Sequence, residues 1–202
     1  MLVPGLLHSA DVTNMRFIFD GRKTAQAACF LVELNGGAMN YMVLIKLLYL
    51  SDRRSLVETG LPITGDQMVS MPHGPVLSRT YDQINMGEPP ETDEEAVHWY
   101  EYMTEPDGYT VRKKKDPETD QLSQYELDVL AEIYEKFGQM NRWRLRDFTH
   151  TLPEWVDPRG SSLPIEPETI LRAHGKSSTE IERMIEDAEE VWFMRNLNQI
   201  TH

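Results

Sequence analysis

The sequence of 202 residues has a single cysteine, few basic residues and no apolar run long enough to cross a bilayer. One cysteine excludes an internal disulfide and favours a reducing compartment. Cys29 stands in an apolar stretch, so we interpret it as a small core residue rather than a nucleophile. The longest apolar run, residues 41–50, is half of the about 20 residues that a membrane-spanning helix needs. The N-terminus lacks the pattern of a secretory signal, so we expect a cytoplasmic protein with no membrane partner.

The shortage of basic residues also limits the partners. The chain has 20 Lys and Arg against 33 Asp and Glu, a formal net charge of −13. Phosphate backbones attract basic surfaces, so this composition argues against nucleic-acid partners and against a DNA-binding autorepressor. It favours a basic protein partner instead.

Motifs for catalysis and for cofactor binding are missing as well. The sequence has no phosphate-binding loop, dinucleotide-binding glycine pattern, zinc-protease motif, CxxC pair or nucleophile elbow. Its six histidines lack the spacing of metal ligands. We therefore expect a protein that is not an enzyme, with no cofactor and no metal site. One catalytic alternative stays open, a hydrolase that uses a cluster of Lys46, Asp52 and His73.

What the sequence does contain is organised around residues 40–60. Residues 41–50 are apolar or aromatic except Lys46, with Asn40 suited to cap the helix start and Gly60 suited to follow its end. A helix that is apolar on all sides must be surrounded by protein, so we expect a central helix. Lys46 and Asp52 lie about 120° apart around it, so each needs a partner elsewhere. We favour a structural interpretation, in which the Lys46 amine reaches solvent and a buried ion pair is formed, over one in which Lys46 and Asp52 are functional.

The remaining pattern predicts a compact, mainly α domain of the α+β class with a small antiparallel β-hairpin. The hairpin is expected to pair Val97–Met103 with Tyr109–Lys113. Capping boxes are expected at Thr92/Glu95, Ser123/Glu126 and Ser177/Glu180. Other expected elements are a strand at 15–19, a strand within 68–71 and helices at about 22–34, after Gly74-Pro75, at 124–137, after Asn141, at 167–174 and from Ser177 onwards.

Three blocks of sequence follow one another in the middle of the chain. They are Lys46-Leu47-Leu48-Tyr49-Leu50-Ser51-Asp52, Gly60-Leu61-Pro62-Ile63-Thr64-Gly65-Asp66 and Gly74-Pro75-Val76. In this order and spacing they resemble the Panacea domain, the family of SocA-like, phage-associated antitoxins, and two later residues match as well. The family-motif residues are Lys46, Leu47, Tyr49, Asp52, Pro62, Gly65, Asp66, Gly74, Pro75, Val76, His150 and Trp155. We expect a flexible arm at 1–14, the domain at 15–157 and a helical extension at 158–202 packed on it.

The resemblance implies an antitoxin that neutralises its cognate toxin by direct protein binding. It leaves open a proteolytic adaptor that delivers the toxin to an ATP-dependent protease. Residues Lys46, Asp52, Gly74 and Pro75 are expected to maintain the fold rather than contact the toxin.

Three surfaces are candidates for toxin binding, and the sequence does not choose among them. One is the end of the basic run after the hairpin, and a second is a basic and aromatic patch whose tryptophan we expect to fold back onto the core. The third is the acidic face of the last helix, which suits a basic toxin. Their residues are Lys113 and Lys114, then Arg142, Trp143 and Arg144, then Glu182, Glu186 and Glu189.

Overall fold

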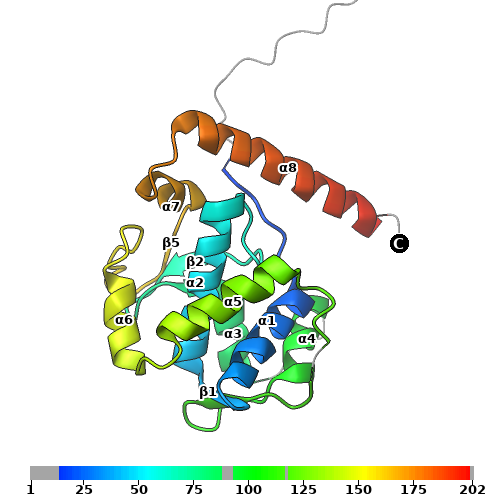
Figure 1. The fold of residues 1–202 in the computed structure, drawn as a ribbon, viewed down its shortest axis with the longest axis vertical. Helices are drawn as coiled ribbons and strands as arrows, with labels where there is room; N and C mark the ends of the chain where they lie inside the picture. The colour runs from blue at the N-terminus through cyan, green and yellow to red at the C-terminus, as the bar shows by residue number, and fades with distance from the viewer. Residues whose placement is uncertain (1–13, 88–92, 117, 201–202) are drawn as a thin grey trace, which may run out of the picture.

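The structure, a computed structural model, describes residues 14–87, 93–116 and 118–200. This part of the chain forms eight helices and five short antiparallel strands, which confirms the mainly α fold class (Figure 1). The helices are α1 (Gly21–Leu34), α2 (Tyr41–Thr59), α3 (Ser78–Met86), α4 (Glu94–Tyr102), α5 (Gln124–Phe137), α6 (Arg142–His150), α7 (Pro167–Ala173) and α8 (Ser178–Ile200). The strands are β1 (Ala38–Asn40), β2 (Met68–Ser70), β3 (Val76–Leu77), β4 (Thr110–Arg112) and β5 (Leu163–Pro164).

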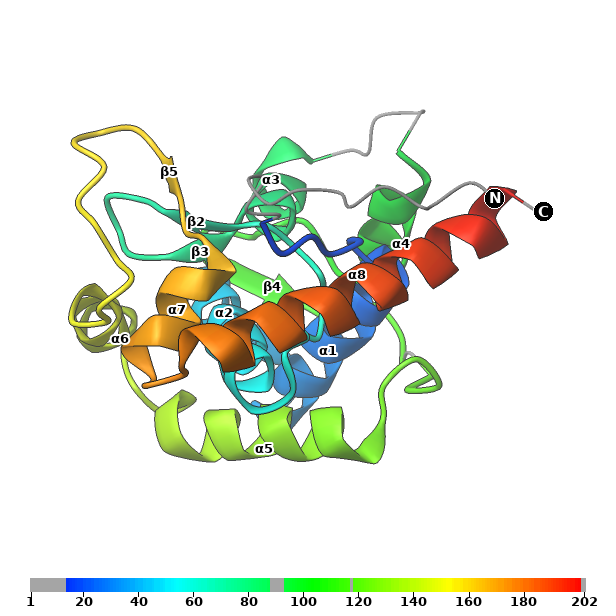
Figure 2. The same cartoon turned by 90° about the horizontal axis from the view of Figure 1, so that it is seen from above.

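Helix α2 lies at the centre of the fold, in contact with α1, α3, α5, α6 and α7 (Figures 1 and 2). Its start is capped by the Asn40 side chain, which accepts from the Met42 N–H at 3.0 Å, and Gly60 ends it with a φ of 83°. All ten residues at 43–52 are buried. The predicted central helix is therefore confirmed, together with both of its caps.

Two small antiparallel sheets connect segments that are distant in sequence. Strand β1 pairs with β4, and β2 lies between β3 and β5. The predicted strand within 68–71 is confirmed as β2. The second sheet holds the segments before α3 and before α7 together, next to the central helix.

The predicted hairpin of Val97–Met103 with Tyr109–Lys113 is wrong. The first half is the helix α4 with its C-cap, and Ala96, Trp99 and the C-cap residue Met103 are buried at helical spacing while Val97 is exposed. β4, in the second half, pairs with β1, and only one isolated bridge joins Met103 to Lys113. Aromatic and branched side chains suggested a strand, but the apolar positions follow a helical period and pack against α1.

Three further expectations are corrected. Residues 15–19 form no strand, because their backbone pairs with no strand among the described residues, and the Met15 N–H is bonded to Glu168 Oε1 at 2.8 Å. Pro75 does not begin a helix, since the chain first forms β3 and α3 starts at Ser78. α4 is capped by Asp93, not by a box of Thr92 and Glu95. Thr92 itself lies outside the described residues.

The end of the chain runs across one side of the domain. Helix α7 confirms the predicted helix at 167–174, and the box of Ser177 with Glu180 is present at the start of α8. The first half of α8 buries Ile181 and Ala188, whereas its last turns extend beyond the body (Figure 1). No described helix is long and apolar enough to span a membrane. The predicted arm at 1–14 lies outside the described residues except for Asn14, and the predicted domain boundaries stay predictions.

Candidate functional site

The buried amine of Lys46 is the most unusual polar group in the core. Lys46 is 3% exposed, and its Nζ donates a hydrogen bond to the Pro75 carbonyl at 2.6 Å. Among the described residues it forms no salt bridge, so both expectations, a solvent-reaching lysine and a buried ion pair, are wrong. Burial lowers the pKa of Lys46 to about 7, since desolvation disfavours the charged amine.

The chain passes very close to this amine at Gly74. Gly74 has a φ of +90°, and a β-carbon there would lie 2.5 Å from Thr149 Oγ1 and 3.1 Å from Lys46 Nζ. A left-handed backbone and this lack of space both require glycine. The motif Gly74-Pro75 therefore joins the loop after β2 to α2 and to the end of α6.

His150 completes this corner. Its ring stacks on Trp155, with ring centroids 4.0 Å apart, and Trp155 Nε1 donates to the Met71 carbonyl at 3.1 Å. The Nε2 atom of His150 is buried without a hydrogen-bond partner among the described residues. Burial, and then the nearby Lys46, lower the pKa of His150. The corner thus contains two groups that readily become cationic and are both biased towards their neutral forms.

Asp52, also on α2, makes a second set of buried contacts, with the loop that follows the helix. One of its carboxylate oxygens accepts from the Ile63 and Thr64 N–H groups at 3.1 and 3.0 Å, and the other accepts from Thr64 Oγ1. Burial raises the pKa of Asp52 to about 7, against the opposing effect of these hydrogen bonds. Asp52 therefore shapes the 61–66 loop on the side of α2.

Asp66 repeats this arrangement one step further along the loop. Its carboxylate accepts from the Arg79 and Thr80 N–H groups and from Thr80 Oγ1, at 2.7–3.0 Å, at the start of α3. Burial raises the pKa of Asp66. Beside it, Gly65 has a φ of +69°, and a β-carbon there would lie 2.1 Å from the Ile18 carbonyl oxygen. Asp52 and Asp66 thus each hold a stretch of backbone in place, the first at 63–64 and the second at 79–80.

A third buried contact was missed in the sequence. Glu154, 3% exposed, accepts from Tyr49 Oη at 2.7 Å and pairs with Arg53 Nε at 2.5 Å. Burial alone would raise the pKa of Glu154, but the hydrogen bond and charge of Arg53 hold it below its usual value. Arg53 stands directly after the first motif block and Glu154 directly before Trp155. Their adjacency to motif residues was the available signal.

The structure does not assemble the cluster of Lys46, Asp52 and His73 that the hydrolase alternative needs. Lys46 faces Pro75 and His150, whereas both oxygens of Asp52 are bonded to the 63–64 backbone and to Thr64. His73 is exposed. The described residues contain no group of three or more His, Cys, Asp or Glu able to hold a metal ion. Cys29 is buried as expected, and burial raises its pKa to about 12, which leaves an unreactive thiol.

The motif residues without polar roles belong to the core or to its edge. Leu47 and Val76 are buried, and Pro62 lines a groove beneath α8. The twelve motif residues thus surround α2 and the segments packed on it, and they do not converge on one cavity.

Of the predicted contact residues, those of the basic run are engaged within the molecule. Lys113 pairs with Glu33 and Asp116, and Lys114 Nζ donates to the Tyr100 carbonyl at 2.6 Å. The run therefore holds the segment after β4 against α1 and α4.

The basic and aromatic patch lies on α6 and is exposed. Trp143 is 46% exposed, so the expectation that it folds back onto the core is wrong. The Arg142 guanidinium lies 4.8 Å from the Trp143 ring centroid and 4.1 Å from that of Tyr109. Arg146 covers Trp143 at 5.0 Å, and Arg144 is exposed. These stacked side chains form an accessible cationic surface.

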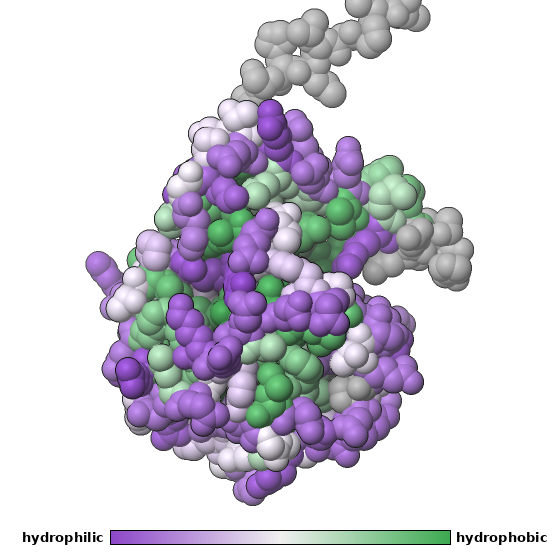
Figure 3. Space-filling model, in the orientation of Figure 1, coloured by the Kyte–Doolittle hydropathy of each residue, from purple (hydrophilic) through white to green (hydrophobic). Residues whose placement is uncertain are grey.

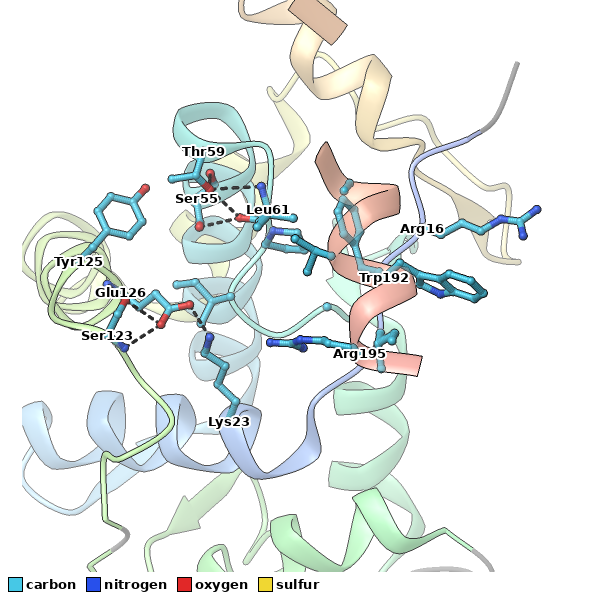
Figure 4. A pocket seen from close by; sticks show the side chains of 17 residues that line it. Arg16, Lys23, Ser55, Thr59, Leu61, Ser123, Tyr125, Glu126, Trp192 and Arg195 are labelled. Carbon is cyan, nitrogen blue, oxygen red and sulfur yellow. Dashed lines mark hydrogen bonds and ion pairs between the residues drawn. The ribbon is translucent and has the colours of Figure 1, made fainter. Parts of the chain in front are cut away.

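The acidic helix α8 borders a groove of about 160 Å³ (Figure 4). Its other walls are the 16–18 segment, the end of α2 with the 61–65 loop, the start of α1 and the start of α5. Arg195 extends from α8 into the groove, and Lys23 pairs with Glu126 at 2.6 Å on the far wall. Of the predicted α8 contacts, Glu182 and Glu186 are exposed and Glu189 is half-buried.

Comparison with known proteins gives one family. No curated protein and no solved structure matches the chain. The family model described as antitoxin SocA-like, Panacea domain, matches residues 44–156, more than half of the 202 residues. All the motif residues described above, from Lys46 to Trp155, lie within the match. The chain is therefore a member of the SocA-like antitoxin family and carries its Panacea domain.

Proposed function

We propose that the protein is the antitoxin of a toxin–antitoxin pair and that it neutralises its toxin by direct binding in the cytoplasm. The observation that carries the proposal is the family match over residues 44–156, with every motif residue engaged in the fold. Membership of an antitoxin family also favours a role without catalysis, and the separation of Asp52 from Lys46 agrees with it.

The buried motif residues and the exposed residues of the surface have different roles in this proposal. Lys46, Asp52 and Asp66 are buried and form hydrogen bonds to the backbone around α2, so a partner cannot contact them without disturbing the fold. Exposed side chains on α6 and α8 are available instead. Toxin recognition is thus expected from the surface, with the Panacea motif keeping that surface in place.

Co-expression with the product of a neighbouring gene, taken as the candidate toxin, tests the proposal. Growth is scored with the toxin alone, with the toxin plus this protein, and with the toxin plus an Arg53→Met variant designed to weaken the fold. Rescue by the wild-type chain at unchanged toxin abundance supports neutralisation by binding. Rescue with a shortened toxin half-life would instead assign the adaptor role, and failure to rescue would contradict an antitoxin for that toxin.

A further inference from the structure

The last turns of α8 carry a run of apolar side chains that the fold leaves exposed. Val191, Trp192, Phe193 and Met194 are between 37% and 60% exposed. Successive residues of a helix lie about 100° apart, so four in a row cover most of its circumference. In α2 the same all-round apolar pattern is buried by surrounding helices. Figure 3 shows hydrophobic side chains at the projecting end of α8.

Carboxylates accompany this run. Glu186, Glu189 and Glu190 line a shallow depression of about 580 Å³ together with Trp192, Phe193 and Arg16. None of these three carboxylates forms a salt bridge with a described residue, whereas Lys113 and Lys115 of the basic run are paired. Among the described residues that line this depression Arg16 is the only cation, so three carboxylates against one guanidinium leave it negative overall, which suits a cationic partner.

The run also continues into the groove beneath the helix. Val191 and Trp192 line the groove opposite Phe17 and Leu61. An apolar side chain of a bound segment thus finds contacts on both sides of α8. Recognition of an amphipathic helix uses this combination of apolar anchors in a hollow and charges along the rim.

We infer that this end of α8, the α8 face (Glu186, Glu189, Glu190, Val191, Trp192, Phe193 and Met194), docks a basic amphipathic helix of the toxin. The inference rests on the proposed function and names the contact surface. A second copy of the chain is a poorer occupant, because it would bring the same carboxylates together at a net charge of −13 per chain.

The test measures binding of the full-length protein to two labelled helical peptides of about 18 residues, one of Leu and Lys and one of Leu and Glu. We expect the Leu/Lys peptide to bind and the Leu/Glu peptide not to bind. Trp192→Ser with Phe193→Ser, and separately Glu189→Gln with Glu190→Gln, should weaken binding roughly tenfold or more. Matched controls are Trp143→Ser on α6 and Asp128→Asn with Glu135→Gln on α5, which should leave binding unchanged. Circular dichroism checks that every variant is folded.

Several results would overturn the inference. An equal loss of peptide binding in the α8 variants and in the controls would show that binding is unspecific. Unchanged binding in the α8 variants would show that the peptide binds another surface. A dimer that Trp192→Ser with Phe193→Ser dissolves would assign the face to a second copy. Stronger binding after deletion of residues 2–13 would assign it to the chain's own N-terminus. An α8 variant that no longer binds the peptide but still rescues growth would refute this surface and leave the antitoxin function standing.

Discussion

Gly74 lies directly against the buried amine of Lys46, since a β-carbon at position 74 would lie only 3.1 Å from Lys46 Nζ. The same β-carbon would lie 2.5 Å from Thr149 Oγ1, so this one position joins the central helix, the loop after β2 and the end of α6. The match to the SocA-like family covers all three segments. Gly65 and Gly74 of the motif thus mark positions where a β-carbon has no space.

Gly74→Ala should destabilise the protein by more than the strain of its backbone alone. A left-handed alanine costs about 1 kcal/mol, and the contacts with Thr149 and Lys46 should raise the loss of unfolding free energy to roughly 3 kcal/mol. Urea unfolding measures it. The control is Gly160→Ala, which has a φ of +89° and nothing within 4 Å of the added carbon. Equal losses in both variants would show that space at Gly74 is not limiting.

Lys46 should make stability depend on pH. Its folded pKa of about 7 lies below the unfolded value near 10.4, so between these values the unfolded chain binds a proton that the folded chain does not. The free energy of unfolding should therefore rise from pH 7.5 to 9, by up to about 1.4 kcal/mol per pH unit. Asp52, with a folded pKa raised to about 7, has the opposite effect, and its effect is confined to lower pH.

Replacing the amine checks this assignment. Lys46→Met should lose most of the slope between pH 7.5 and 9, whereas Lys136→Met, which replaces an exposed lysine, should keep it. Urea midpoints at four pH values measure both variants. A slope in Lys46→Met equal to that of the wild-type chain would mean that another group is responsible.

The buried pair of Arg53 and Glu154 should contribute more to the free energy of unfolding than the exposed ion pairs of Arg54. Arg53→Met leaves the Glu154 carboxylate buried with only Tyr49, which should cost about 3 kcal/mol of unfolding free energy. Arg54→Met removes the exposed pairs with Glu58 and Glu132 and should cost less than about 1 kcal/mol. Chemical unfolding compares the adjacent positions. A larger loss at Arg54 would contradict this ranking.

Trp143 should contribute little to stability despite its size. Because it lies exposed between two arginines, Trp143→Ala should change the unfolding free energy by less than about 0.5 kcal/mol. Trp99→Ala, at 2% exposure, should cost about 3–5 kcal/mol. Thermal and urea unfolding of the two variants test the contrast, and a similar loss in both would mean that Trp143 packs on the core in solution.

Local signals accounted for much of the fold. Asn40, Gly60 and Ser123 act within one turn of their own helix, so their roles could be predicted from neighbouring residues. The structure of residues 97–103 could not be predicted in this way. Their side-chain types favour a strand, and the helix is selected by packing against α1.

The candidate site depended on contacts across the chain. The Lys46 amine is satisfied by a carbonyl 29 residues away, and Glu154 lies 101 residues from Arg53. Neither partner follows from spacing. The amphipathic pattern of α8 likewise predicted a helix, but it did not show that the apolar side chains at its end would be left uncovered.

The most direct test of the account mixes the purified full-length protein with the purified toxin in the absence of any protease. Size-exclusion chromatography with light scattering follows complex formation, and the toxin's own activity is assayed in the same sample. We predict a stable complex and inhibition that saturates at a fixed ratio of the two proteins. Rescue of growth in cells without any complex or inhibition in the purified mixture would contradict neutralisation by direct binding.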